Sequence, residues 1–310
     1  MPTKPAEAAI PGPARWRGYV YIAAATFCWA AAATVGKAVF NGKLFAGHAQ
    51  ISPLVLTQAR TSFTVLVLAA YLLVRFGRGF FRICARDLAL CALAGTLGIA
   101  GSNFFYYLAI QKSTVAIAIT LQYTTPVWVL TYMVLSGREH AIWSRAGAVV
   151  LALLGIFLTI GLFQSGLKFD ALGVAAGLLA SFSFAFYNVL GTSLVNRQHQ
   201  LKVMLYALLG AAILWAVINP PWRLAAQQYD ARQWGFLFAF AGLSQLLPYS
   251  LYFTGLRHLD ATRAVIASCL EPVFAVLFAA AFVGEGVGGL QVLGMLAVLA
   301  ATILAQSHSS

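Results

Sequence analysis

A single glutamate lies in the middle of a long apolar stretch near the end of this 310-residue chain. Glu271 is preceded by "TRAVIASCL" and followed by "PVFAVLFAAAFVG". A carboxylate in such a position is costly, and it marks a functional site by default. It can hold an organic ammonium group or carry a proton, because removal from water favours its neutral form. The alternative is structural, with Glu271 tied to Arg60 or to nearby backbone groups.

Two prolines lie at the centres of apolar stretches. Pro126 and Pro272 each remove one helix hydrogen bond and clash with the carbonyl four residues earlier, which belongs to Gln122 or Ser268. Such kinks are tolerated in a membrane where they line a cavity or pack within protein. We expect them to act as hinges or to offer carbonyl groups to a ligand, and plain helix bending is the alternative.

Other chemistries lack their motifs. There is no G-x-x-x-x-G-K-[ST] loop, so ATP is not expected to drive this protein directly. All five histidines fall in predicted loops or in the C-terminal tail, and the four cysteines show no C-x-x-C spacing. We therefore expect no metal, no cofactor and no enzymatic activity.

The composition is that of an integral membrane protein. Hydrophobic residues make up 61% of the chain and charged residues 9%, with a mean hydropathy of +0.83. Soluble domains are about half apolar and a quarter charged. Apolar stretches of the length that crosses a bilayer as a helix recur along the chain. They predict an all-α bundle of ten transmembrane helices, at 19–40, 52–75, 88–110, 113–135, 142–163, 170–194, 202–218, 234–256, 262–284 and 288–306.

The net charge of +12 follows from topology. Lysine and arginine are concentrated in the N-terminal segment, residues 1–18, and in the even-numbered connections, which include Arg145 and Arg263. The positive-inside rule then predicts that both termini are cytoplasmic. We therefore expect the lipid bilayer, and not nucleic acid, to be the partner of this basic chain. Lys37 lies near the outer end of its span, where its ammonium group can reach the interface.

The chain contains an internal repeat. The segment 106–139 aligns with 252–285 at a constant offset of 146, pairing Tyr106 with Tyr252 and Pro126 with Pro272. Each copy holds five spans, at 19–163 and 170–306, and an odd number inverts the second copy in the membrane. Inverted repeats are typical of secondary transporters, whose substrate site lies near the midplane between the halves.

The order of these features resembles the drug/metabolite transporter superfamily, specifically its EamA-type exporters. The resemblance is carried by ten spans in two repeats, Trp29 in span 1, Arg60 in span 2, and the "EP" of span 9 followed by Glu285. It implies a basket in which spans 1, 3, 4, 6, 8 and 9 line a central cavity. Because span 2 lies away from that cavity, Arg60 is expected to be structural, like Lys37.

Those cavity spans carry many neutral polar and aromatic side chains. Such a mixture suits a small zwitterion with a variable side chain, because aromatic faces hold an ammonium group by cation–π contact. For each aromatic side chain alone, lipid or core packing is the alternative. The predicted substrate-binding residues besides Glu271 are Trp29, Asn103, Tyr106, Gln122, Tyr123, Tyr187, Asn188, Gln245 and Tyr249.

The resemblance and the lining together predict a monomeric exporter in the bacterial inner membrane, working by alternating access. Its expected substrates are amino acids, aromatic and other neutral ones with broad specificity, and related small metabolites. Export of drugs or lipophilic cations is one alternative, although it would favour more than one buried acid. Exchange of nucleotide sugars or phosphate esters is another, and it would need more basic residues in the cavity. A lipid-directed enzyme or a receptor stays open as a less favoured class.

Overall fold

A computed structural model describes residues 12–40, 44, 51–112, 115–137, 143–160, 170–278, 280–281 and 288–305. Within these ranges the regular structure is entirely helical, and it forms ten consecutive segments at the positions that the hydropathy predicts. Six segments are single helices: α1 (Gly12–Phe40), α2 (Pro53–Phe76), α7 (Trp143–Thr159), α8 (Ala171–Val195), α9 (Gln200–Ile218) and α15 (Gly289–Leu304).

The other four segments are interrupted. They are α3–η2–α4 (Ala85–Leu93, Ala94–Ala100, Gly101–Lys112), α5–α6 (Val115–Gln122, Thr125–Leu135), α11–η3–α12 (Ala231–Ala241, Gly242–Leu246, Leu247–Gly255) and α13–α14 (Ala261–Ser268, Leu270–Phe278). Two short helices, η1 (Arg78–Phe81) and α10 (Pro221–Ala225), lie in connections. The interruptions fall in the spans predicted to line the cavity.

The exterior of the bundle is apolar, as a bilayer requires. Six of the described segments have at least 18 residues and are apolar enough to cross a membrane, while α7 and α15 are shorter apolar helices. Large apolar side chains point outward, among them Val74, which is 89% exposed, and Leu135, which is 83% exposed. Hydrocarbon satisfies such side chains as well as a protein core does. The predicted all-α membrane fold is confirmed.

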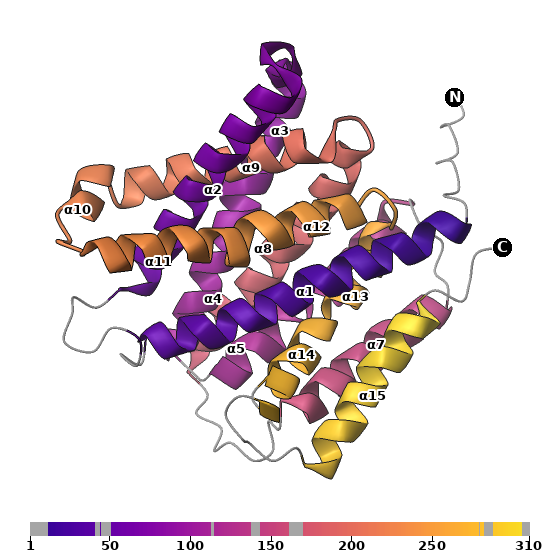
Figure 1. The fold of residues 1–310 in the computed structure, drawn as a ribbon. Coiled ribbons are helices and arrows are strands. Elements are labelled where there is room, and N and C mark those ends of the chain that lie inside the picture. The colour runs from indigo at the N-terminus through magenta and orange to yellow at the C-terminus, as the bar shows by residue number, and fades with distance from the viewer. Residues whose placement is uncertain are drawn as a thin grey trace.

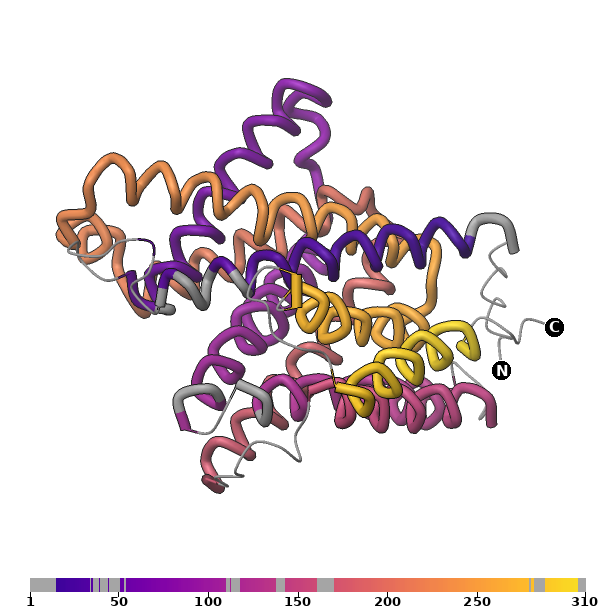
Figure 2. Tube along the Cα trace, turned by 60° about the horizontal axis from the view of Figure 1, so that its bottom comes forward, coloured from indigo at the N-terminus to yellow at the C-terminus, as the bar shows by residue number. Residues whose placement is uncertain are grey.

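The helices cross one another as a basket (Figures 1 and 2). The long helix α1 runs across α12, α13 and α14, and α7 and α15 form an antiparallel pair beside them. On the other side, α8 packs against α4 and α5, and α9 packs against α2 and α3. The start of α1 and the end of α15 lie at the same end of the molecule.

The α7–α15 pair approaches to backbone distance through two glycines. A Cβ atom on Gly294 would lie 2.4 Å from the Thr159 backbone nitrogen, and one on Gly155 would lie 2.8 Å from the Gly294 carbonyl oxygen. Gln291 adds a hydrogen bond from Nε2 to the Thr159 carbonyl oxygen at 3.3 Å. Small residues are the usual means of bringing membrane helices this close.

The third and eighth spans each contain a π-helical turn at matching positions of the repeat, η2 and η3. Sequence patterns did not indicate either turn. In the eighth span the turn immediately precedes Pro248, which has no N–H group to continue an α-helical ladder. Turns of this kind are rare and frequent at functional sites, and these two lie directly before the site-bearing helices α4 and α12.

We expect Gly95→Ala in η2 to destabilise the protein by about 1–3 kcal/mol, the usual range for overpacking. A Cβ atom there would lie 1.8 Å from the Ala207 carbonyl oxygen, so α9 would have to move. Gly242→Ala is the matched control, because Gly242 begins the turn of the eighth span and a Cβ atom there meets nothing within 4 Å. Thermal unfolding in detergent should separate the two variants, and equal loss in both would contradict this account.

Candidate functional site

The breaks in the fourth and ninth spans position the central acid. The fourth span is interrupted at Tyr123 and Thr124, just before Pro126, and the ninth is interrupted at Cys269, just before Pro272. In the fourth span the Thr125 hydroxyl donates to the Gln122 carbonyl oxygen at 2.6 Å, which satisfies a group released from the helical ladder. The position of Thr125 in the second repeat is taken by Glu271, the first acidic residue of α14.

Glu271 is joined to the first repeat by a short hydrogen bond. The Tyr123 hydroxyl donates to Glu271 Oε2 at 2.6 Å, a length typical of a bond to a charged oxygen. Tyr106 also lies within electrostatic reach of this carboxylate. The second oxygen, Oε1, makes no hydrogen bond to any described residue, so the carboxylate keeps one oxygen for a ligand.

A cation lies close to the same acid. Arg60, which was predicted to be a structural charge on a span away from the cavity, donates from Nη2 to Asn103 Oδ1 at 3.1 Å. Arg60 acts electrostatically on Glu271, but the two side chains are too far apart to form an ion pair. The site therefore presents a negative and a positive group that interact electrostatically without forming an ion pair.

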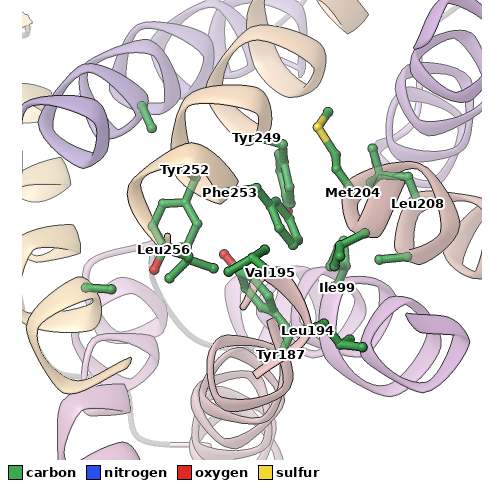
Figure 3. Close-up of a cluster of buried hydrophobic side chains, with 14 of the residues drawn as sticks. Ile99, Tyr187, Leu194, Val195, Met204, Leu208, Tyr249, Tyr252, Phe253 and Leu256 are labelled. Carbon is green, nitrogen blue, oxygen red and sulfur yellow. The ribbon is translucent and has the colours of Figure 1, made fainter. Parts of the chain in front are cut away.

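Aromatic rings cover one end of the site. Trp29 packs against Tyr249 and Tyr252 with ring centroids 5.3 and 5.2 Å apart, and the Tyr187 ring lies 6.0 Å from that of Tyr252. Figure 3 shows Tyr187 of α8 directed toward Tyr249, Tyr252 and Phe253 of α12. These rings form a packed layer that is part of the hydrophobic core.

Asn188 belongs to this layer and is fully engaged. Its Oδ1 accepts from the Tyr252 hydroxyl at 2.5 Å and its Nδ2 donates to the Phe184 carbonyl oxygen at 2.8 Å. Tyr252 is also 3.1 Å from the Ser268 hydroxyl oxygen. Because Asn188, Tyr252 and Ser268 are buried and satisfied, they do not face a ligand in this conformation.

The remaining predicted residues lie nearby or outside the described part. Gln122 donates to the Ser102 hydroxyl oxygen at 3.3 Å. Gln245 is buried and donates to the Thr61 hydroxyl oxygen at 3.2 Å, which ties η3 to α2 beside Arg60. The side chain of Lys37 and the residue Glu285 lie outside the described residues.

Exposure changes abruptly at Glu271. All ten residues of 261–270 are buried, whereas Glu271, Asn103 and Tyr106 keep partial exposure. The side of α13 is thus closed in the sense that every residue of this helix is buried, and partly exposed residues begin at the acid. We call the closed side the Asp260 end, after the residue that precedes α13.

Ion pairs hold the Asp260 end together. Asp260 Oδ2 lies 3.2 Å from Arg145 Nη2 on α7 and 2.6 Å from Arg263 Nη1 on α13. Arg263 Nε donates to the Ala305 carbonyl oxygen at the end of α15 at 2.9 Å. Both arginines were predicted to be charges of connecting loops, but they are only 8% and 6% exposed. The acid that pairs them lies more than a hundred residues from Arg145 in the sequence, which is why no local pattern revealed the cluster.

Comparisons with known proteins agree on one family. The EamA-like transporter family matches residues 16–161 and again residues 171–306. The chain is 31% identical over 244 residues to the threonine/homoserine exporter RhtA of Salmonella typhimurium, covering 77% of this chain and 78% of that protein. The exporter of the same name from Escherichia coli is 28% identical over the same length. A solved crystal structure superposes with a TM-score of 0.74 over 94% of this chain and 96% of its own, at 18% identity.

Proposed function

Because the chain belongs to the EamA-like transporter family, we propose that it is a secondary transporter that exports amino acids across the bacterial inner membrane. Threonine and homoserine are the first substrates to test, since they are named for its relatives. Aromatic and other neutral amino acids and related small metabolites follow. The transporter is a monomer with both termini in the cytoplasm, and the inverted repeats 19–163 and 170–306 alternate access to a site between them.

The observation that carries this proposal is the Tyr123–Glu271 pair. Tyr123 belongs to the first repeat and Glu271 to the second, so a ligand bound at the carboxylate contacts the seam that must move. An ammonium group is the natural partner of a membrane-buried carboxylate with one unoccupied oxygen. A ligand shifts the balance between two conformations when its contacts at the interface between the repeats differ between them.

The test is uptake of radiolabelled amino acids into proteoliposomes that contain the purified protein. Threonine, homoserine, methionine, phenylalanine, leucine, lysine and glutamate are assayed in parallel against protein-free vesicles. We expect saturable uptake of the neutral amino acids with mutual inhibition. If folded protein carries none of them, the amino-acid proposal is wrong, and lipophilic cations and phosphorylated metabolites become the next candidates.

Tyr123→Phe should lower transport at subsaturating substrate by about 10-fold or more, the effect of losing one hydrogen bond to a charged group. The ring stays in place, and only the 2.6 Å bond to Glu271 is removed. Tyr71→Phe is the control, because Tyr71 lies on α2 and is 54% exposed. Initial uptake rates measure the difference, and an unchanged rate for Tyr123→Phe would remove Tyr123 from the site.

A further inference from the structure

We propose that Arg60 and Asn103 form the carboxylate-binding half of the site, so that its substrates must carry an unmodified carboxylate beside the ammonium group. This inference rests on the proposed function and narrows it to one chemical class. It also assigns to Arg60 a binding role in place of the structural role that its position in span 2 suggested.

Two buried donors at this position lack an acceptor. Arg60 Nε and Asn103 Nδ2 are inaccessible and have no hydrogen-bond partner within the described residues. Nearly all buried polar groups in proteins are paired, and an unpaired one needs an explanation. A guanidinium group is an especially costly donor to leave unsatisfied in a membrane. Both orphaned atoms belong to residues that also contact each other, so the two oxygens of one carboxylate can each accept from one of them.

The hydrogen bond between Arg60 and Asn103 determines which hydrogen-bonding groups the two side chains can present to a ligand. A guanidinium group only donates, so the oxygen of the Asn103 amide must face Arg60 and its Nδ2 must point away. Asn103 Nδ2 is directed toward the Tyr249 hydroxyl and interacts with it, but the two groups do not reach the distance and angle of a full hydrogen bond. The pair thus presents a cation and an adjacent amide donor, and planar carboxylates are recognised by such arrays of N–H groups.

The second charge of the site defines the substrate class. Arg60 and Glu271 interact electrostatically without forming an ion pair, so a ligand with both charges can lie between them. A zwitterion satisfies Arg60, Asn103 and Glu271 together. An amine that has no carboxylate is repelled by the buried Arg60 cation. A doubly charged phosphate ester is repelled by the Glu271 carboxylate. Specificity of this kind comes from the groups that a wrong ligand leaves unpaired.

The first arm of the test uses wild-type protein. Uptake of labelled threonine, or of the best-carried amino acid, is inhibited with the unlabelled amino acid, its methyl ester, its amide and the corresponding decarboxylated amine. We expect the ester, amide and amine to inhibit at least about 10-fold more weakly, as loss of a charged hydrogen-bond partner predicts. Equal inhibition by all four compounds would overturn the carboxylate site while leaving amino-acid transport intact. Absence of any amino-acid uptake would instead overturn the proposed function.

The second arm uses two variants of different design. Arg60→Gln removes the cation, and Asn103→Asp keeps the oxygen that accepts from Arg60 while replacing the Nδ2 donor with a negative oxygen. In both we expect the apparent KM for the amino acid to rise at least about 10-fold, with the amine affected less. The ratio between inhibition by the amino acid and inhibition by its methyl ester should fall in both variants. Size-exclusion profiles and thermal unfolding establish that the variants fold, and if Arg60→Gln does not, the nearly isosteric Asn103→Asp decides. Unchanged discrimination in a folded variant overturns the assignment.

Discussion

Glu271→Gln is expected to reduce amino-acid transport at least about 30-fold while the protein stays folded. The amide has nearly the same shape as the carboxylate, and its oxygen can still accept from the Tyr123 hydroxyl. What disappears is the negative charge, and truncating one partner of a buried charge pair costs about 2–5 kcal/mol of binding. Because a neutral amide is easier to bury than a carboxylate, the thermal stability should be equal or higher.

Two transport measurements separate the roles open to this acid. Counterflow of labelled amino acid needs substrate binding but no ion gradient, whereas accumulation driven by a proton gradient needs both. Loss of both activities identifies Glu271 as the ammonium partner; retained counterflow with lost accumulation identifies it as a proton carrier only. Glu271→Asp keeps the charge at a different distance and should lose activity only in part. A Gln variant that transports normally, or that fails to fold, would contradict the binding role.

The fold follows from the sequence because each of its determinants is local or periodic. Membrane spans are read from the length of apolar stretches, and the second repeat is read from its offset. The helix breaks at Tyr123 and at Cys269 were expected near Pro126 and Pro272, because the effect of a proline is confined to its own helical turn. The π turns η2 and η3 have no comparable residue signal beyond Pro248, and they were not expected.

Site chemistry was accessible from the sequence only where a single residue was conspicuous. Glu271 stood out because charge in hydrocarbon is rare, and its bond to Tyr123 joins two residues that the sequence analysis selected separately. Arg60 stood out equally, but its role depends on whether it meets Glu271 or Asn103 across the bundle. Asn188 was selected as a polar group in a cavity span, yet its two hydrogen bonds are both satisfied internally. Which polar groups are paired is a property of packing, and packing is not periodic in the chain.

The ion cluster at the Asp260 end leads to the second large expected effect, an opening of that end in Asp260→Asn. One carboxylate oxygen serves two buried arginines, Arg145 on α7 in the first repeat and Arg263 on α13 in the second. Asp260→Asn takes the charged partner of these two ion pairs away from both arginines, and breaking a buried pair in this way costs about 3–5 kcal/mol. The conformation that relieves this charge is one in which the two arginines reach water, so the closed state loses its advantage.

Two native cysteines report where the protein opens. Cys269 is buried at the break beside Glu271, on the closed side of the site, and Cys91 is buried between α3 and α9. In variants that keep one cysteine each, Asp260→Asn should raise the maleimide labelling rate of Cys269 at least about 10-fold, since 1.4 kcal/mol already shifts an equilibrium by that factor. Labelling of Cys91 should stay slow, because its surroundings do not include the cluster.

Asp260 has a second role, which is to cap the N-terminus of α13, so the control variant must make the same substitution at another helix-capping aspartate. Its Oδ1 accepts from the Arg263 backbone N–H at 2.8 Å, and Asp170 caps α8 in the same way with a 2.9 Å bond from Gly173. Asparagine is an equally good cap, so Asp170→Asn changes a capping charge without touching the cluster. It should leave both labelling rates unchanged. Equal acceleration at Cys269 and Cys91 in Asp260→Asn would indicate general unfolding, and no acceleration at either would show that packing alone keeps this end closed. Only selective exposure of Cys269 assigns the closure of the site to the ion cluster, in which Asp260 of the second repeat pairs with Arg145 of the first.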